Sequence, residues 1–509
     1  MFIDIKRGLS TIYKNVKIRH YLCEMRWLYF LFLGGFSAVS LAQNSLPKTQ
    51  ESNVEKLTLE KCIQIALSNN LDVQLSAIAN TSAEYDLLQS KLNLGPDING
   101  TAGQYYQSGR SIDRFTNQYV QTTIGSNNFQ IQGNWILFAG GQLRNAINQY
   151  KYNKLATEQD LLQVKQTICL NVSLAYLQCL QGREQQKAVA ATVESSKNEL
   201  DRVQKLLSAG AANEGALWSA KAQYLNNVSN YTQAENGYNS AVNTMKNLLM
   251  INSEVAVEIS AEMPAVPQNK NEKYSLTELI DSAMNHRPDI KAAQFRLNAS
   301  EFALKSAKGA LLPSLTIGGN LNTVYSGNAK TVTGYSINGT QPIGYVKSTL
   351  EVVEAPSVSY TTKTIAFGNQ IKVNFGQSFG ATMSVPIYGK LQTHTQISQA
   401  KLSILRNEIS LNKSVQNLKT DVTSAYINYT NSLAKYLALE ETHKAQKKNL
   451  EFVQIRFQNG QASQFEMQSA QNTEINAYMN LISSNYEYIF RQLVLDFLIN
   501  NQITNLSNK

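Results

Sequence analysis

The stretch IKVNFGQSFGATMSVPI, residues 371–387, decides the fold of this chain. Its odd positions are mostly apolar and its even positions are mostly polar or small, which is the period of two of a strand with unlike faces. A tilted strand that crosses an outer membrane needs roughly 9–11 residues, so this segment is long enough to span one. The alternative is a long edge strand of a soluble β-domain. In lipid a lone strand cannot pair its backbone groups, so a membrane location requires further strands.

Three further segments show strand patterns, at about 97–107, 129–138 and 314–325. With 371–387 they make two pairs, and we expect four strands in the chain. The pattern of 97–107 is the weakest of the four. The stretch 326–368, between the last two strands, is rich in Gly, Ser and Thr, and we expect a polar loop there.

The chain is an internal duplication. Leu59–Pro96 recurs at Leu276–Pro313 with a constant offset, and later pairs such as Gly210 and Gly460 repeat at a larger one. We expect a first repeat at 57–264, a linker at 265–273 and a second repeat at 274–498, between an N-terminal segment at 43–56 and a C-terminal tail at 499–509.

Residues 1–42 read as a signal peptide, with an apolar run and the small-x-small site Ser40-Leu41-Ala42. Met25-Arg26 already opens such a peptide, so residues 1–24 are either an over-extended start or a long positively charged leader. Six basic and two acidic residues lie in 1–42, so the formal charge of +9 falls to about +5 without it. This modest charge argues against nucleic acid as a partner.

Each half contains helices of very different length. Thr58–Leu94 and Ser275–Leu312 predict helices that end before a proline. Proline-free runs at Gln142–Ser208 and Leu391–Gln458 predict helices of about 100 Å each, and a shorter helix follows each of them after Gly210 and Gly460. A coiled-coil seam marks the second long run at Leu411, Val415, Leu418, Val422, Ala425 and Tyr429. We expect an antiparallel bundle in which each long helix packs against two short ones in series.

Four strands cannot close a barrel, because about eight is the smallest number known. If the strands span the outer membrane, the chain must oligomerise and its helices must project into the periplasm, where a cyclic assembly would enclose a channel. The sequence contains no P-loop, metal-binding motif or paired cysteines, and its histidines are scattered. We therefore expect no catalytic residue, no metal and no cofactor, and we interpret Cys62, Cys169 and Cys179 as small buried hydrophobic residues.

The order of the motifs resembles the TolC-like outer-membrane efflux protein family across residues 57–498. The motifs that carry the resemblance are the two helix openings Leu59-x3-Ile63-x2-Ala66 and Leu276-x3-Ile280-x2-Ala283, Asn285-His286-Arg287-Pro288-Asp289-Ile290, Leu311-Leu312-Pro313, Trp135-Ile136-Leu137-Phe138-Ala139-Gly140-Gly141, Val385-Pro386-Ile387-Tyr388-Gly389 and Arg456-Phe457-x2-Gly460-x2-Ser463. The resemblance implies a membrane β-barrel of twelve strands, four from each copy of a homotrimer, on an all-α periplasmic tunnel of coiled-coil helices. It also implies two partners, a periplasmic adaptor protein and an inner-membrane transporter of the RND or ABC type.

We expect the turns at Gly210 and Gly460, with Ser463 beside the second, to be the part farthest from the membrane, and we call them the distal turns. We expect them to contact the adaptor or pump; the alternative is a glycine C-cap without a partner.

The resemblance assigns a tunnel-entrance constriction to Glu466 and Ser469, although only the first is acidic, and an ordinary solvated role for Glu466 stays open. We expect Arg456 and Phe457 either to hold the closed state of the tunnel entrance or simply to pack within the helix bundle.

The predicted function is a passive exit duct for small molecules, driven by an inner-membrane pump. The first alternative is the outer-membrane component of a type I protein secretion system. A distant alternative is a periplasmic coiled-coil structural protein without a barrel.

Overall fold

The computed structural model describes residues 55–112, 119–252, 254–255, 257–260 and 275–500. The chain divides into two units, and all described residues lie in the second, Val54–Lys509. The predicted signal peptide, the linker at 265–273 and most of the C-terminal tail lie outside the described residues. The first half comprises β1 (Glu55–Leu57), α3 (Leu59–Asn69), α4 (Leu71–Leu92), β2 (Asp97–Ile112), β3 (Tyr119–Ala139), α5 (Gln142–Ser208), α6 (Glu214–Leu249) and β4 (Val257–Ile259). The second comprises α7 (Leu276–His286), α8 (Pro288–Gly309), β5 (Ser314–Ser326), β6 (Lys330–Tyr345), β7 (Val352–Thr364), α9 (Phe367–Val373), β8 (Gly376–Ser384), α10 (Gln392–Gln458) and α11 (Gln464–Asn500).

The two long helices, α5 and α10, contain 67 residues each, as the proline-free runs predict. The predicted seam of α10 faces inward: Leu418, Val422 and Ala425 are buried against Leu279 of α7 and Leu495 of α11. Among the helices of the described ranges, none is both long enough and apolar enough to span a bilayer.

The predicted continuous helices Thr58–Leu94 and Ser275–Leu312 are wrong, because each is broken into two. Asn70 leaves the helical region with ψ 128°, and its side chain caps α4 by accepting hydrogen bonds from the amides of Asp72 and Val73. Arg287 takes the same extended conformation before Pro288, whose ring disfavours helical geometry in the residue ahead of it.

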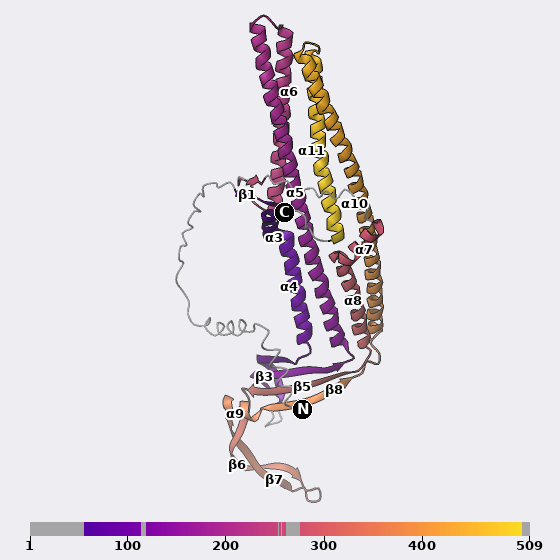
Figure 1. Cartoon of the computed structure of the whole chain (residues 1–509). Coiled ribbons are helices and arrows are strands. Elements are labelled where there is room, and N and C mark those ends of the chain that lie inside the picture. Colours follow the sequence, from indigo (N-terminus) through magenta and orange to yellow (C-terminus); the bar gives the residue numbers. More distant parts are fainter. Residues whose placement is uncertain (1–54, 113–118, 253, 256, 261–274, 501–509) are drawn as a thin grey trace, which may run out of the picture. The chain divides into compact units, whose positions relative to one another are not determined.

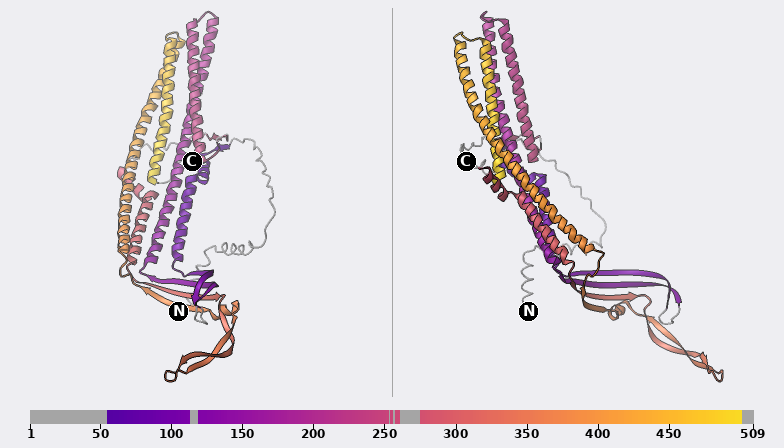
Figure 2. Two further views of the ribbon diagram at one scale, coloured as in Figure 1. Left: turned by 180° about the vertical axis from the view of Figure 1, so that it is seen from behind. Right: turned by 90° about the vertical axis from the view of Figure 1, so that its right-hand side faces the viewer.

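The helices form a layer in the order α4, α5, α8, α10, in which each helix contacts the next. Figures 1 and 2 show α6 beside the part of α5 that is remote from the sheet, and α11 beside the corresponding part of α10. Each long helix therefore packs against short helices in series, as predicted. The contact of α8 with both α5 and α10 joins the two halves of the chain.

The predicted count of four strands in the chain is wrong, because the described residues contain eight. The four predicted strands form one antiparallel sheet in the order β2-β3-β5-β8. Apart from the short helix α9, the helices lie beyond one end of the sheet in both figures. A separate parallel pair, β1 and β4, joins the start and end of the first half and buries Leu57 and Ile259.

The predicted strand 371–387 is wrong at both ends, since β8 covers only Gly376–Ser384. Ile371–Val373 belong to helix α9, where the buried Gln370 side chain binds backbone groups of Ser326 and Ile365. Tertiary packing thus overrides the alternation. At the other end, Ser384 pairs with Ser314, the first residue of β5 after Pro313, and the partner strand goes no further.

The predicted polar loop at 326–368 is also wrong, because it contains a long antiparallel hairpin of β6 and β7. Three register shifts interrupt its ladder, near Val332/Gly334, Ile337/Thr340 and Pro342/Gly344. Each shift breaks the period of two, so no long alternating run is visible in the sequence.

A pair of glycines joins helices and sheet. A Cβ at Gly140 would lie 2.2 Å from the carbonyl oxygen of Gly309, and one at Gly309 would lie 2.6 Å from that of Gly140. Gly140 also has φ +58°, a conformation that side chains disfavour. The end of α8 can therefore pack directly on the turn between β3 and α5.

Candidate channel surfaces and distal turns

The four-stranded sheet has one polar and one apolar face. Across it, Asn99, Gln132, Asn320 and Ser378 form one row of paired residues, and Thr101, Gln130 and Asn322 another row on the same face. The opposite face presents a different set: Ile98, Phe129, Ile131, Trp135, Ile317, Leu321, Phe379 and Met383.

These faces suit two different solvents. A side-chain amide transferred to hydrocarbon without a partner costs about 4–8 kcal/mol, so the Asn and Gln face requires water. The opposite face can contact acyl chains at no such cost. The sheet can thus separate an aqueous space from a bilayer.

Both distal turns have the same glycine geometry. Gly210 and Gly460 have φ of +74° and +70°. The amide of Gly210 donates to Leu207 at 3.0 Å and that of Ala211 to Leu206 at 2.8 Å; Gly460 and Gln461 repeat both bonds with Phe457 and Arg456. This is the Schellman arrangement, in which glycine is preferred because it alone adopts a left-handed conformation without strain.

The second turn gathers three of the predicted residues. The Ser463 amide donates to the Glu466 carboxylate at 2.7 Å, and the Glu466 amide donates to Ser463 Oγ at 3.2 Å, forming a reciprocal capping box for α11. Arg456 lies 3.7 Å from this carboxylate and also donates to the Gln461 carbonyl. The hydrogen bonds from Ser463, helped by the charge of Arg456, lower the pKa of Glu466.

Phe457 connects the helical hairpin of α10 and α11 to the helical hairpin of α5 and α6. The Arg202 guanidinium lies 5.7 Å from the centre of its ring, and Glu199 binds Arg202 through two hydrogen bonds of 2.8 Å. The bonds to Glu199 raise the pKa of Arg202. Gln464 donates to the same Glu199 carboxylate at 3.0 Å. Ser469 stands apart: its side chain is exposed, and its carbonyl accepts a bond from Thr473.

Sequence reasoning missed an amide network between the two hairpins. Gln223 of α6 donates to Asn472 at 3.1 Å and accepts from Gln468 at 2.6 Å. The network borders a groove of about 310 Å³ between α5/α6 and α10/α11. Its members come from different halves of the chain, so spacing along the sequence could not have paired them. The only signal was the high content of Asn and Gln in the helices.

Comparison with known proteins identifies the fold and then the family. The outer-membrane channel CmeC of Campylobacter jejuni has the same fold, with a TM-score of 0.67 over 94% of this chain and 95% of that one at 18% identity. The sequence matches the outer membrane efflux protein family over residues 62–249 and 279–501, and the chain belongs to that family.

Two named relatives agree with this. The toxin and drug export protein A of Aggregatibacter actinomycetemcomitans is 21% identical over 434 residues, 85% of this chain and 84% of that protein. The outer membrane protein TolC of Escherichia coli K12 is 21% identical over 466 residues, 91% and 83% of the two. The chain is thus an outer-membrane efflux channel component located in the cell outer membrane, and its family is one of channels rather than enzymes.

Proposed function

We propose that three copies of this chain close into one duct, with a shared barrel of twelve strands above a shared helical tunnel in the periplasm. The observation that carries the proposal is that sheet and helix layer end in matching edges. The strands of the sheet are ordered β2-β3-β5-β8 and the helices of the layer α4-α5-α8-α10. The edge strand β2 directly follows the edge helix α4 in the chain, and the other edge strand β8 directly precedes the other edge helix α10. One head-to-tail rotation therefore closes both layers.

The edge helices carry the apolar surface that such a contact needs. One face of α4 exposes Leu71, Leu75, Ile78, Tyr85 and Leu92, which follow a seven-residue repeat. Near the sheet, α10 exposes Leu402, Leu405 and Ile409. Neither stripe is covered within one copy, and a neighbouring copy would bury both.

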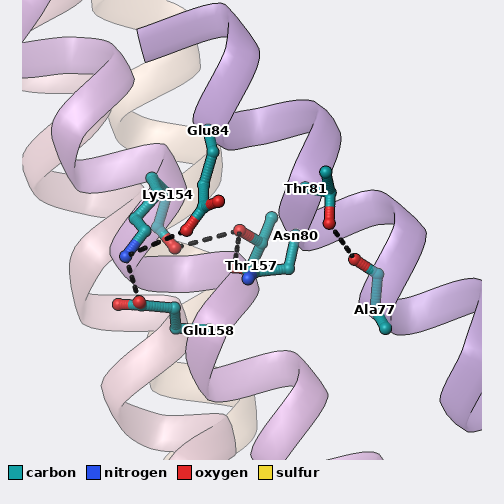
Figure 3. Close-up of polar contacts among 7 residues, drawn as sticks. All are labelled: Ala77, Asn80, Thr81, Glu84, Lys154, Thr157 and Glu158. Carbon is teal, nitrogen blue, oxygen red and sulfur yellow. Dashed lines mark hydrogen bonds and ion pairs between the residues drawn. The ribbon is translucent and has the colours of Figure 1, made fainter. Parts of the chain in front are cut away.

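The two stripes lie at the same level along the helix layer, as hydrogen bonds that run from helix to helix across the layer show. Thr157 of α5 donates to Asn80 of α4 at 3.3 Å, where Lys154 also lies 3.7 Å from Glu84 (Figure 3). One turn along α5, Asp160 pairs with Arg296 of α8, whose carbonyl accepts from Asn407 of α10. Ile78 is therefore level with Leu405 and Ile409.

The count of three rests on strands and on family resemblance. A barrel needs about eight strands or more, so two copies of four would reach only the minimum, and eight strands leave an interior filled by side chains. Twelve strands leave a wider lumen, which the polar rows of Asn, Gln and Ser would line.

At the far end, the distal turns at Gly210 and Gly460, with Ser463, are proposed to receive a periplasmic adaptor protein and an inner-membrane transporter of the RND or ABC type. The cargo we propose is small molecules. Protein secretion remains the second candidate, since the name of one relative includes both toxin and drug export.

Photocrosslinking in cells tests partner and cargo together. Ala211 and Gln461 occupy the same position in the two turns and are both exposed, whereas Ser463 caps α11 and should not be replaced. Each would be substituted by a photoreactive residue, and the captured proteins identified by mass spectrometry. An adaptor with a proton-driven pump supports small-molecule efflux, and an adaptor with an ATP-driven transporter favours protein secretion. Capture of neither would overturn the docking of the turns.

A further inference from the structure

Helix α9 is fastened to the end of the sheet remote from the other helices, at the base of the β6–β7 hairpin (Figure 1). The Gln370 side chain, 2% exposed, fixes it there. This amide donates to the carbonyls of Ser326 at 3.1 Å and Ile365 at 2.8 Å, and accepts from the Ser326 amide at 2.9 Å. Asn374 adds a bond to the Val324 carbonyl at 2.8 Å. The helix is therefore a fixed part of the sheet's rim.

α9 lies on the apolar face of the sheet. The Phe367 ring contacts Phe129 edge-on at 6.3 Å and Tyr325 at 5.1 Å. Thr323 Oγ1 donates to the Ile371 carbonyl at 2.8 Å. The strand register places Phe129, Thr323 and Tyr325 together on the face opposite the Asn and Gln rows. Three independent contacts thus put α9 on the side that faces lipid in the proposed barrel.

The height of α9 corresponds to one boundary of the apolar band. Phe129 and Phe138 mark the two ends of the apolar part of β3 and are nine residues apart. Because a bulge lies between Ile136 and Phe138, the partners of the two rings on β5, Thr323 and Leu315, are only eight residues apart. At about 3.3 Å per residue and a tilt near 40°, the two ends are separated by about 20 Å along the membrane normal, of the same order as the roughly 25 Å of an outer-membrane apolar band. Phe367 therefore lies at the outer boundary, where aromatic side chains are favoured.

The surface of α9 suits that boundary. Val373 is 82% exposed and Phe367 50% exposed, and Phe375, just after the helix, is 54% exposed. Lys372, also exposed, lies between these apolar residues. Lysine beside exposed aromatic and aliphatic side chains is the composition of segments that lie in the plane of a bilayer surface, with the ammonium group among head groups.

We propose that α9 is an interfacial helix that docks on the outer leaflet of the bilayer, with Phe367, Val373 and Phe375 among the upper acyl carbons and Lys372 at the phosphate level. This inference rests on the proposed function, because it requires the apolar face of the sheet to face lipid. It gives each copy an anchor on the outside of the barrel, and the β6–β7 hairpin begins at this level.

Quenching by lipid and water tests the position of α9. Single cysteines would replace Val373 and, separately, Phe375 in the chain without its predicted signal peptide, which removes Cys23, and with Cys169→Ala, since Cys62 and Cys179 are buried. A fluorescent label on each is then read in phosphatidylcholine vesicles that contain nitroxide-labelled phosphatidylcholine, and again with aqueous iodide. The reference positions are Phe379, 80% exposed on the apolar face of β8, and Lys347 in the turn between β6 and β7.

We expect labels at residues 373 and 375 to be quenched by the nitroxide lipid about as strongly as one at 379 and several-fold more than one at 347. Quenching of both by iodide, as at 347, would overturn the inference, because α9 would then lie in water. Protection from both quenchers would overturn it too, because a second copy would cover the helix. If the label at residue 379 itself were not quenched by the nitroxide lipid, the proposed barrel would be contradicted, and not only the position of α9.

Discussion

Glu466 stands at the second distal turn, and two of its properties can be separated by substitution. As a cap it needs only an acceptor for the Ser463 amide, which glutamine supplies; as part of a constriction it needs its charge. We expect Glu466→Gln to keep the turn but to lower the preference of the channel for cations in planar-bilayer recordings. Glu466→Ala should also loosen the start of α11, because the Ser463 amide loses its acceptor. Unchanged ion selectivity in the Gln variant would show that Glu466 is a cap alone.

Asp496 of α11 is expected to destabilise the protein at neutral pH. Burial raises the pKa of its carboxyl from near 3.8 to about 6. A carboxyl with a raised pKa favours the folded state fully below pH 4, and this contribution is lost as the pH rises through 6. Asp496→Asn should therefore be more stable than the parent at pH 7.5, by about 1–2 kcal/mol after allowance for its partial exposure.

Thermal melting of the detergent-solubilised protein between pH 4 and pH 8 checks the Asp496 prediction. The gap between parent and Asp496→Asn should close toward pH 4. Asp421→Asn, at an exposed aspartate of α10, serves as the control and should melt like the parent. A lower melting temperature for Asp496→Asn at pH 7.5 would refute the argument from burial.

At the residue scale, the sequence predicts backbone roles better than side-chain partnerships. Gly210 and Gly460 could be located because they repeat at one offset and because helix ends favour left-handed glycine. All three described cysteines are free, and Cys62 and Cys179 are buried as predicted, whereas Cys169 is only partly buried. The bond between Gln464 and Glu199 joins residues 265 positions apart in the two halves of the chain, and nothing local to either residue indicates it.

At the scale of elements, the contact between Gly140 and Gly309 is the most sensitive junction. Gly140→Ala meets both a backbone oxygen at 2.2 Å and a left-handed φ, so we expect a loss of at least about 2 kcal/mol in unfolding free energy. Gly309→Ala should lose less, because its φ is ordinary. Gly380→Ala on β8, where a Cβ would meet no atom within 4 Å, is the matched control. Denaturant unfolding of the three variants decides; an unaffected Gly140→Ala would mean that helix and turn can move apart.

The long helices and the centres of the four sheet strands could be predicted because single rules govern them. Proline-free runs set the bounds of α5 and α10, and alternation set the middle of β8. The ends of β8 could not be predicted, because they depend on where β5 stops and on the side chain of Gln370. The hairpin β6–β7 was missed because its bulges disrupt the pattern that would have revealed it. The break at Pro288 carried a signal in the sequence, whereas the one at Asn70 depends on a cap.

For the whole molecule, the proposed ring predicts that the α4 stripe is an interface between copies. Ile78→Glu should abolish the trimer, because a carboxylate would be buried against Leu405 and Ile409 of the next copy. The mass of the detergent-solubilised protein, measured by light scattering, reports the result. Ala79→Glu, an exposed neighbour off the stripe, should remain trimeric.

A cysteine pair makes the same contact specific. With Ile78→Cys and Leu405→Cys in one chain, oxidation should link copies into covalent dimers and trimers, whereas either single variant should give none. Intact trimers from Ile78→Glu together with no crosslink from the pair would place the interface elsewhere. The sequence predicts that copies must combine, from the count of strands alone, whereas the proposal that α4 meets the next copy depends on the exposed stripes.

The two open edges of the sheet also govern how the protein matures. A single copy presents unpaired backbone groups along β2 and β8, together with the uncovered apolar stripes of α4 and α10, and such edges pair readily with other chains. In the proposed ring, newly exported copies must pair with one another before they pair with other proteins, so the yield of channel should rise more steeply than linearly with the rate of synthesis. A periplasmic chaperone that shields strand edges would therefore be needed most when expression is low and encounters are rare.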